Sequence, residues 1–377
     1  MSSVDRQHES LVCFAFAATG YGHQSAANAI ANSLFNQPNS VPSILIDAFA
    51  NSTNSVLRNG SAIYNFTSTH CVNAYDAAWN ATNRPLLNRA TALLSQAPWA
   101  RSELDEISLD LVVVTHPLLV PNMARTAIRR SDRSAPLVTV VTDPVSPHLS
   151  WTAGEPDYVF AVTDIAADRL EPALSPNTTL MRVQFPVSPE FQKPRINPAA
   201  GRHRAGLRDL PTALFVGGGA GSGQIDRDVR LALSTTDHQL LVACGENRKL
   251  LAKFSNLDER VIALGPRSSL LSLYDAADWV VGKAGPATIH ECQARGRPLL
   301  ATSEVGFQER GNIAFSISLG VGTDCRSAAN LVEALRSNPV QTQTAETTPP
   351  RIETLLVDIL AGREVGCLRP ESVAAAA

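Results

Sequence analysis

Three glycine-containing segments of the 377-residue sequence each follow an apolar run and precede residues typical of a helix. In the first, residues 18–25 read Ala-Thr-Gly-Tyr-Gly-His-Gln-Ser, with His23 directly before an Ala-rich stretch. A helix N-terminus disfavours the imidazolium cation, so a histidine placed there suits the role of a general base. The alternative is a tight turn formed by Gly20 and Gly22, with His23 as a polar cap.

The second segment is the richest in glycine. Five of the seven residues 217–223 are glycine, among them Gly218 and Gly219. Glycines let the backbone approach a ligand closely and present amide groups to phosphate. No Gly-Lys-Ser/Thr follows, which excludes a Walker loop. No acidic residue stands at the expected end of the next strand, which disfavours a nicotinamide cofactor.

The third segment, residues 281–292, reads Val-Gly-Lys-Ala-Gly-Pro-Ala-Thr-Ile-His-Glu-Cys. Pro286 suits the first position of a helix and leaves the amides of Ala287 and Thr288 directed at an anion. Glu291, one turn later, is placed to bind a ribose diol. An ordinary helix start with a solvated glutamate is the alternative interpretation.

A polar group follows in residues 306–312, which read Gly-Phe-Gln-Glu-Arg-Gly-Asn. In a short helical turn, Gln308, Glu309 and Asn312 share one face. Their hydrogen-bonding groups suit sugar hydroxyls. The alternative is that these are ordinary solvent-exposed residues.

Short apolar runs that alternate with longer helix-like stretches position these segments. Such alternation is typical of an α/β protein with parallel, doubly wound sheets, whose ligands bind at the carboxyl ends of the strands. Helices are expected after residue 22, around residues 55–80 and after residue 121. Strands are expected at residues 11–17, 43–47, 111–115, 137–142, 158–162, 213–216, 239–243, 261–263, 279–281 and 299–302.

The alternation divides the chain into two Rossmann-like domains. We predict the first at residues 1–195 and the second at residues 196–345, with a C-terminal helix and flexible tail at residues 346–377. Residues 186–211, rich in Pro, Arg and Asn, interrupt the pattern and are predicted to be a linker.

Composition excludes several classes of protein. Hydrophobic residues make up 44% and charged residues 18% of the chain, which argues against intrinsic disorder. A formal net charge of -3 without a long basic block argues against nucleic acid as a partner. No apolar run reaches the ~18 residues of a membrane span, and the N-terminus lacks a signal-peptide core, so we expect a cytoplasmic protein.

Neither cysteines nor carboxylates predict a metal site. The six cysteines contain no Cys-x-x-Cys pair and are expected to be mostly small core residues. Asp226 and Asp228 lie two apart in a predicted helix, where they face different directions, so we expect a solvated face.

The order and spacing of these motifs resemble the monogalactosyldiacylglycerol synthase and diacylglycerol glucosyltransferase group of glycosyltransferase family 28. The likeness covers most of the chain. Further matches, in the same order as in that family, are His116-Pro117-Leu118, Thr142-Asp143 followed by His148 and Trp151, Phe185-Pro186-Val187 with Pro189-Glu190-Phe191, and Cys244-Gly245-x-Asn247.

This resemblance implies a GT-B fold whose first domain binds the acceptor and whose second binds a nucleotide-sugar. It also implies an inverting, metal-independent displacement without a cofactor, in which His23 removes the proton from an acceptor hydroxyl. Asp143 and His148 join His23 as implied catalytic residues on the acceptor side. The other implied acceptor-side residues are Tyr21, Gly22, His116 and Trp151.

The donor site is implied in the same way. Amides near Ala287 and Thr288, with Gly218 and Gly219 nearby, would hold the leaving diphosphate, while Glu291 would bind the ribose. Gln308 and Glu309 would bind the sugar hydroxyls. The full implied donor set is Gly218, Gly219, Gly265, Gly285, Ala287, Thr288, Glu291, Gln308, Glu309 and Asn312.

Four positions depart from the family pattern. Tyr21 stands where the family usually has Gly, and Gln24 where it often has Arg. Pro266 replaces an aromatic residue that lies against uracil, and Phe307 replaces a Gly before Gln-Glu. These changes are expected to alter specificity sooner than chemistry.

The expected activity is that of a hexosyltransferase in glycolipid biosynthesis, moving galactose or glucose from a UDP-sugar to a lipid such as diacylglycerol. Residues 52–89 are a candidate for peripheral membrane contact, although their aromatic side chains equally suit packing on the first domain; they are Tyr64, Phe66, Tyr75 and Trp79, with Leu86 and Leu87 beside them. Three alternatives stay open: a soluble small-molecule acceptor, a nucleotide-sugar 2-epimerase, and a non-catalytic binder of nucleotide-sugar.

Overall fold

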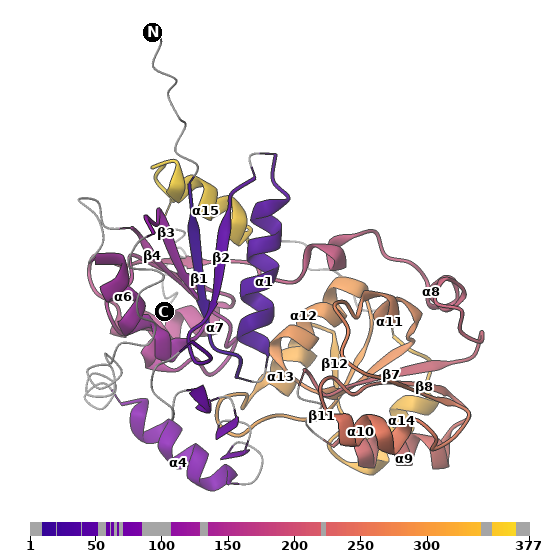
Figure 1. Cartoon of the computed structure of the whole chain (residues 1–377). Coiled ribbons are helices and arrows are strands. Elements are labelled where there is room, and N and C mark those ends of the chain that lie inside the picture. The colour runs from indigo at the N-terminus through magenta and orange to yellow at the C-terminus, as the bar shows by residue number, and fades with distance from the viewer. Residues whose placement is uncertain are drawn as a thin grey trace, which may run out of the picture.

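In the computed structural model of this chain, two α/β domains, each built on a sheet of parallel strands, lie side by side (Figure 1). The structure describes residues 10–19, 21–38, 40–51, 58–60, 62–63, 66–67, 71–84, 107–128, 135–219, 224–340 and 349–366, without the side chains of 125–128. Within these residues the strands form two six-stranded sheets, ordered β2-β1-β3-β4-β5-β6 and β12-β11-β10-β7-β8-β9. The expected α/β class with two doubly wound sheets is confirmed.

The inner strands β1, β3 and β4 of the first sheet consist of β-branched and other mainly apolar residues that are buried at every position, as a parallel sheet covered by helices requires. Helices α1 (Gly22–Phe35), α6 (Val120–Ile128) and α7 (Asp164–Leu170) connect its strands. The strands are β1 (Val12–Phe16), β2 (Ser43–Asp47), β3 (Leu111–Val114), β4 (Leu137–Val141), β5 (Tyr158–Ala161) and β6 (Thr179–Arg182).

The last helix, α15 (Ile352–Leu360), returns to the first sheet. Its Leu355 and Leu356 join the same buried cluster as Ile30 and Leu34 of α1, and Figure 1 shows the two helices side by side. Residues 352–360 therefore complete the core of the first domain, although they follow the second domain in the sequence.

The second sheet, like the first, has six strands that alternate with helices along the chain. Its strands are β7 (Thr212–Val216), β8 (Gln239–Ala243), β9 (Val261–Leu264), β10 (Trp279–Lys283), β11 (Leu299–Ser303) and β12 (Gly322–Asp324). Its helices are α9 (Ile225–Thr235), α10 (Arg248–Phe254), α11 (Leu271–Ala276), α12 (Pro286–Arg295), α13 (Asn312–Ser318) and α14 (Ala328–Arg336).

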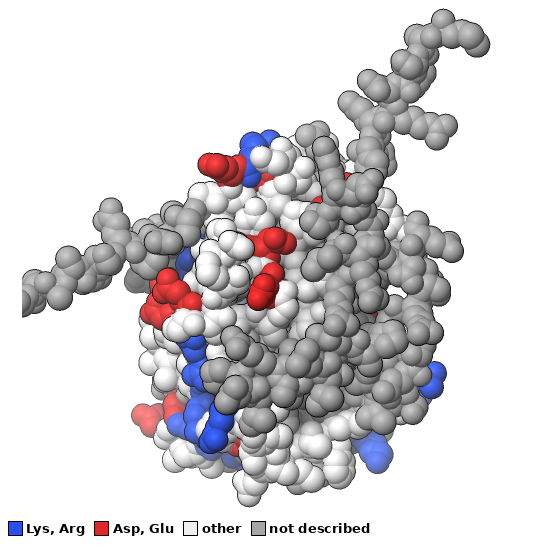
Figure 2. All heavy atoms as spheres, turned by 90° about the vertical axis from the view of Figure 1, so that its left-hand side faces the viewer, with Lys and Arg blue, Asp and Glu red and all other residues white. Residues whose placement is uncertain are grey.

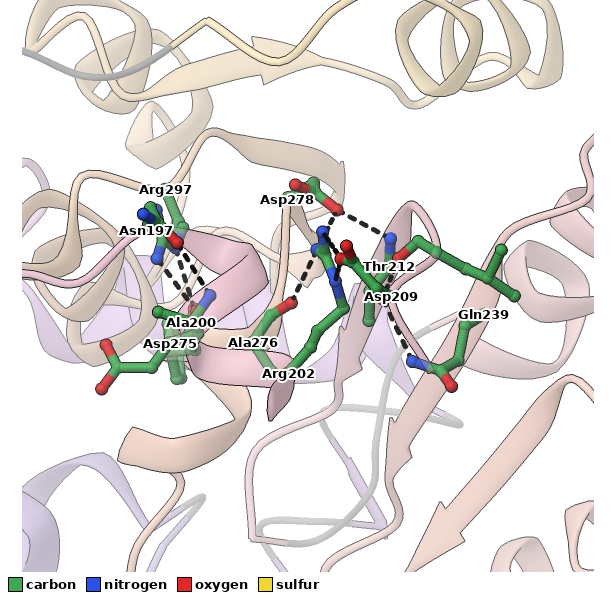
Figure 3. A network of polar contacts seen from close by, with 12 residues as sticks. Asn197, Ala200, Arg202, Asp209, Thr212, Gln239, Asp275, Ala276, Asp278 and Arg297 are labelled. Atoms are coloured by element: carbon green, nitrogen blue, oxygen red, sulfur yellow. Dashed lines mark hydrogen bonds and ion pairs between the residues drawn. The ribbon is translucent and has the colours of Figure 1, made fainter. Parts of the chain in front are cut away.

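The predicted linker, residues 186–211, is more ordered than its composition indicates. It contains a 3₁₀ helix, η5 (Pro189–Gln192), and the helix α8 (Pro198–Arg204). A Cβ at Gly201 would collide with the backbone of Asp275, so α8 packs closely on α11. Arg202 donates to Asp209 at 2.8 Å and to Asp278 at 2.8 Å (Figure 3). These contacts attach the segment firmly to the second sheet.

One other expectation needs correction. The Asp226 side chain is 43% exposed, but Asp228 is only 1% exposed and receives a hydrogen bond from Arg227, so the expected solvated face holds for one of the two carboxylates. Of the helix expected around residues 55–80, the structure describes α4 (Val72–Thr82), and the described residues 58, 60, 62–63 and 66–67 are helical as well. Of the helices in the described ranges, none has the length and apolar character to cross a bilayer.

Candidate functional site

The carboxyl ends of β1, β3 and β4 bring several polar side chains into one buried group. His23, the second residue of α1, is 5% exposed, and its Nδ1 lies 3.1 Å from Oγ1 of Thr142. The rings of His23 and His116 meet edge to face, with centroids 4.5 Å apart. The ring centroid of Trp151 lies 6.1 Å from that of His23.

Burial determines the charge of His23. It lowers the pKa of the imidazole to about 4, while a hydrogen bond with the main chain of Thr115 acts in the opposite direction. The ring is therefore neutral at pH 7, as a general base must be. The sequence predicted this direction from the helix N-terminus, whereas the main cause is removal from water.

Asp143 follows Thr142 at the end of β4 and is 4% exposed. Its Oδ2 accepts a hydrogen bond from Nε1 of Trp151 at 2.9 Å. Burial raises the pKa of this carboxyl to about 6, and hydrogen bonds from Trp151 and Gln308 oppose the rise. Because Gln308 belongs to the second domain, Asp143 lies where the two domains meet.

His116 and His148 both cap 3₁₀ helices. His116 precedes η2 (Pro117–Leu119) and bonds Thr19 at 3.0 Å, whereas His148 precedes η3 (Leu149–Thr152) and accepts from the backbone of Ser150 at 3.1 Å. Burial lowers the pKa of His148 to about 4. The contacts of His148 fix the turn that carries Trp151.

Tyr21 places the first glycine segment against the second. Its backbone is left-handed, with φ 67°, and a Cβ at Gly219 would collide with its ring. Its hydroxyl bonds Glu246, and burial and this partner raise the pKa of Tyr21 to about 12. Gly22 follows Tyr21 as the first residue of α1, and Gly218 precedes Gly219 in the chain. Gly20 and residues 220–223 lie outside the described residues.

The start of α12 forms the next part of the site. Pro286 is its first residue, as the sequence predicted, and Gly285 is its N-cap. A Cβ at Gly285 would have Lys283, Thr288 and Glu309 within 4.0 Å. Lys283 and Glu309 form an ion pair at 2.6 Å. The amide end of α12 and the Glu309 carboxylate are therefore neighbours, and Ala287 packs against the core of the first domain.

The three polar residues after β11 do not share one helical face. Asn312 is the first residue of α13 and donates to the carbonyl of Ala284 at 3.0 Å. Gln308 lies in the preceding turn and points to the first domain, where it accepts from the Tyr75 hydroxyl at 2.9 Å. Glu309 points to Lys283 instead. Gln308 therefore contacts the first domain, whereas Glu309 and Asn312 contact the second.

Glu291 and Gly265 also belong to the second domain. Glu291 accepts from the Tyr274 hydroxyl at 2.7 Å, and burial raises the pKa of Glu291 to about 7. Gly265 precedes Pro266, which lines a hollow of about 780 Å³, a volume in the range of ligand pockets. The other lining residues are Gly245, Glu246, Arg248, Leu251, Ala252 and Ser255.

Sequence reasoning missed the site contacts of Asp76, Thr142 and Lys283. Asp76 accepts from the backbone of Phe307, a residue 231 positions away. Such a pair gives no local pattern in one sequence. Lys283 was recognisable, because it stands in the glycine segment after β10, but its partner Glu309 lies beyond the next strand.

Comparison with solved structures establishes the fold class. The chain is similar to the MnaA protein of S. aureus, solved with UDP (TM-score 0.55, 12% identity, 94% of this chain and 96% of that chain). It is also similar to Arabidopsis thaliana UGT89C1 with UDP-L-rhamnose (TM-score 0.53, 11% identity, 93% of each chain). MurG of Acinetobacter baumannii matches with TM-score 0.51 at 15% identity, over 94% of this chain and 99% of that chain. The fold is the GT-B fold of glycosyltransferases.

Sequence comparison gives the particular relationship: the curated homologues of this chain are monogalactosyldiacylglycerol synthases, so the resemblance drawn from the motifs is confirmed. Synthase 1 of Arabidopsis thaliana is 26% identical over 87% of this chain and 64% of its own length. The spinach (Spinacia oleracea) synthase is 25% identical over 89% of this chain and 67% of its own length. A probable synthase of Glycine max is 30% identical over 59% and 44%. This chain thus spans about two thirds or less of these relatives, and no family model matches it.

Proposed function

We propose that this protein is a glycosyltransferase that moves a hexose from UDP-galactose or UDP-glucose to a lipid acceptor such as diacylglycerol. The names of its homologues support a galactolipid product. Two solved structures with this fold contain UDP or a UDP-sugar, which supports a UDP-linked donor. The observation that carries the proposal is the hydrogen bond from the Tyr75 hydroxyl of the first domain to Gln308 of the second at 2.9 Å, because it joins the two halves of a site.

In the proposed reaction His23 acts as general base. The acceptor oxygen loses its proton to the imidazole and forms a bond to the anomeric carbon, while the bond from that carbon to the UDP oxygen breaks and UDP leaves with the electron pair. A single displacement of this kind inverts the anomeric centre. The neutral state of His23 fits this role, and an acceptor hydroxyl would replace one of its present hydrogen-bond partners.

The leaving diphosphate would bind at the start of α12. A helix N-terminus offers unpaired amides and a positive dipole end to an anion, so the leaving group is stabilised by the backbone in this metal-independent scheme. Glu309 beside this end would bind a sugar hydroxyl, and Lys283 holds the carboxylate in place at 2.6 Å. Glu291 and the hollow beside Pro266 would take the nucleoside.

We further propose peripheral membrane contact through the segment before and within α4. Its apolar side chains are unusually exposed: Ile63 46%, Phe66 58% and Val72 38%. Figure 2 shows the side of the molecule that is on the left in Figure 1, and most of the described surface there carries neither acidic nor basic side chains. Apolar insertion, not attraction to anionic headgroups, would then dominate the binding. Tyr64, Leu86 and Leu87 of the predicted contact lie outside the described residues.

A transfer assay tests the proposal. Radiolabelled UDP-galactose or UDP-glucose is incubated with the protein and with vesicles that contain diacylglycerol, in the presence of EDTA. The expected result is labelled glycolipid, with UDP as the second product. Hydrolysis or transfer only to soluble acceptors would overturn the lipid assignment, and the absence of any UDP-hexose binding would overturn the enzyme class.

A further inference from the structure

The turn after β11 is held by two adjacent residues of α4. The backbone N–H of Phe307 donates to Oδ1 of Asp76 at 2.8 Å, and the Tyr75 hydroxyl donates to Oε1 of Gln308 at 2.9 Å. Gly306 approaches so closely that a Cβ there would collide with Asp76. Two neighbouring residues of the first domain thus fix two neighbouring residues of the second.

These contacts also determine how the Gln308 amide is oriented. Because its oxygen accepts from Tyr75, its NH₂ group is the part left to donate to the Asp143 carboxylate. The side chain is therefore fixed at both ends by the first domain. The turn has an internal support as well, since the Arg310 guanidinium lies 3.6 Å above the Phe307 ring.

Helix α4 can carry such a role because it is held by specific contacts and not by a core. None of its described side chains is fully buried. The Trp79 ring meets His148 with centroids 4.8 Å apart, and Thr82 Oγ1 lies 3.1 Å from Nε2 of His148. One end of α4 thus contacts His148 in the first domain. Tyr75 and Asp76 contact the turn with Phe307 and Gln308 in the second domain.

We propose that Asp76 and Tyr75 are positioning residues that complete the hexose subsite from the acceptor domain. This inference rests on the proposed function, because it assigns residues 306–309 to the sugar. Asp76 fixes the backbone of the turn, and Tyr75 fixes the amide of Gln308. Affinity for the hexose part of the donor then depends on α4, whereas affinity for the nucleotide part, bound at the hollow beside Pro266, does not.

Calorimetric titration with UDP and with UDP-hexose separates the two affinities. We expect Asp76→Ala to weaken UDP-hexose binding about tenfold, as loss of a charge-assisted hydrogen bond does, and to leave the Kd for UDP within about twofold. Asp76→Asn keeps an acceptor oxygen and should restore most of the affinity. Tyr75→Phe should weaken UDP-hexose binding in the same selective way. Asp168→Asn, an exposed carboxylate on α7, is the matched control.

Two outcomes would overturn the inference. One is wild-type affinity of Asp76→Ala for UDP-hexose, and the other is an equal loss of affinity for UDP and UDP-hexose. If wild-type protein binds neither compound, the proposed function itself fails. If wild-type protein binds both and Asp76→Ala behaves like the control, only the role of α4 fails.

Discussion

His23 is hydrogen-bonded to Thr142, the residue before Asp143, and burial favours the neutral form of both His23 and Asp143. It lowers the pKa of His23 to about 4 and raises that of Asp143 to about 6. At pH 7 the histidine is therefore an available base. Asp143 remains mostly ionised, and it accepts hydrogen bonds from Trp151 and Gln308 that favour the charged carboxylate.

The charge state of His23 can be measured directly. In the folded protein its imidazole should stay neutral until the pH approaches about 4, against 6.5 for a solvated histidine. Between these two values the unfolded chain binds more protons at this site, so acidification through the window lowers folding stability. NMR titration of the ring, assigned with His23→Ala, gives the midpoint. A midpoint near 6.5 would contradict the buried, neutral state.

At the scale of elements, α8 shows how a segment with the composition of a linker becomes part of a domain. Arg202 lies between Asp209 and Asp278, and Asp278 also accepts from the backbone of Thr212 at 2.8 Å (Figure 3). The side chains of Arg202 and Asp278 are 10% and 14% exposed. This nearly buried ion pair connects α8 to the first strand of the second sheet.

Removal of this guanidinium should destabilise the second domain. Arg202→Ala leaves Asp278 largely buried with its charge partner gone, which costs about 3 kcal/mol. Arg230→Ala is the matched control, because Arg230 and Asp226 are 50% and 43% exposed and Asp226 keeps Lys253 at 2.7 Å. Urea unfolding measures the free energy of unfolding of both variants and of the wild type. Equal losses for the two variants would refute the role assigned to Arg202.

Elements with a strong pattern were predictable from the sequence, and those held mainly by tertiary contacts were not. Strand β4, Leu-Val-Thr-Val-Val, is buried at every position and was expected at residues 137–142. Edge strand β6, Thr-Leu-Met-Arg, has a single fully buried residue, and β12 is only three residues long, so neither gives a clear apolar run. Helix α8 was missed because Pro198 at its start also suits a loop.

At the scale of the whole molecule, the candidate site is shared between two domains that each supply one wall. The rule that ligands bind at the carboxyl ends of parallel strands directed attention to the loops that carry His23, Asp143 and Glu309, and the structure places these loops after β1, β4 and β11. It could not indicate that Gln308 would turn to Tyr75, 233 positions away, because that contact depends on how the domains meet. The roles inferred for these residues remain predictions.

The most direct test compares chemistry with donor binding in His23→Ala, using single-turnover transfer to diacylglycerol vesicles and the Kd for UDP-hexose. The account predicts that transfer falls at least about 100-fold, as loss of a general base does, while the Kd stays within about twofold. His203→Ala, an exposed histidine on α8, should match wild type in both. Transfer by His23→Ala at the wild-type rate would contradict the account, because His23 would then not be the base.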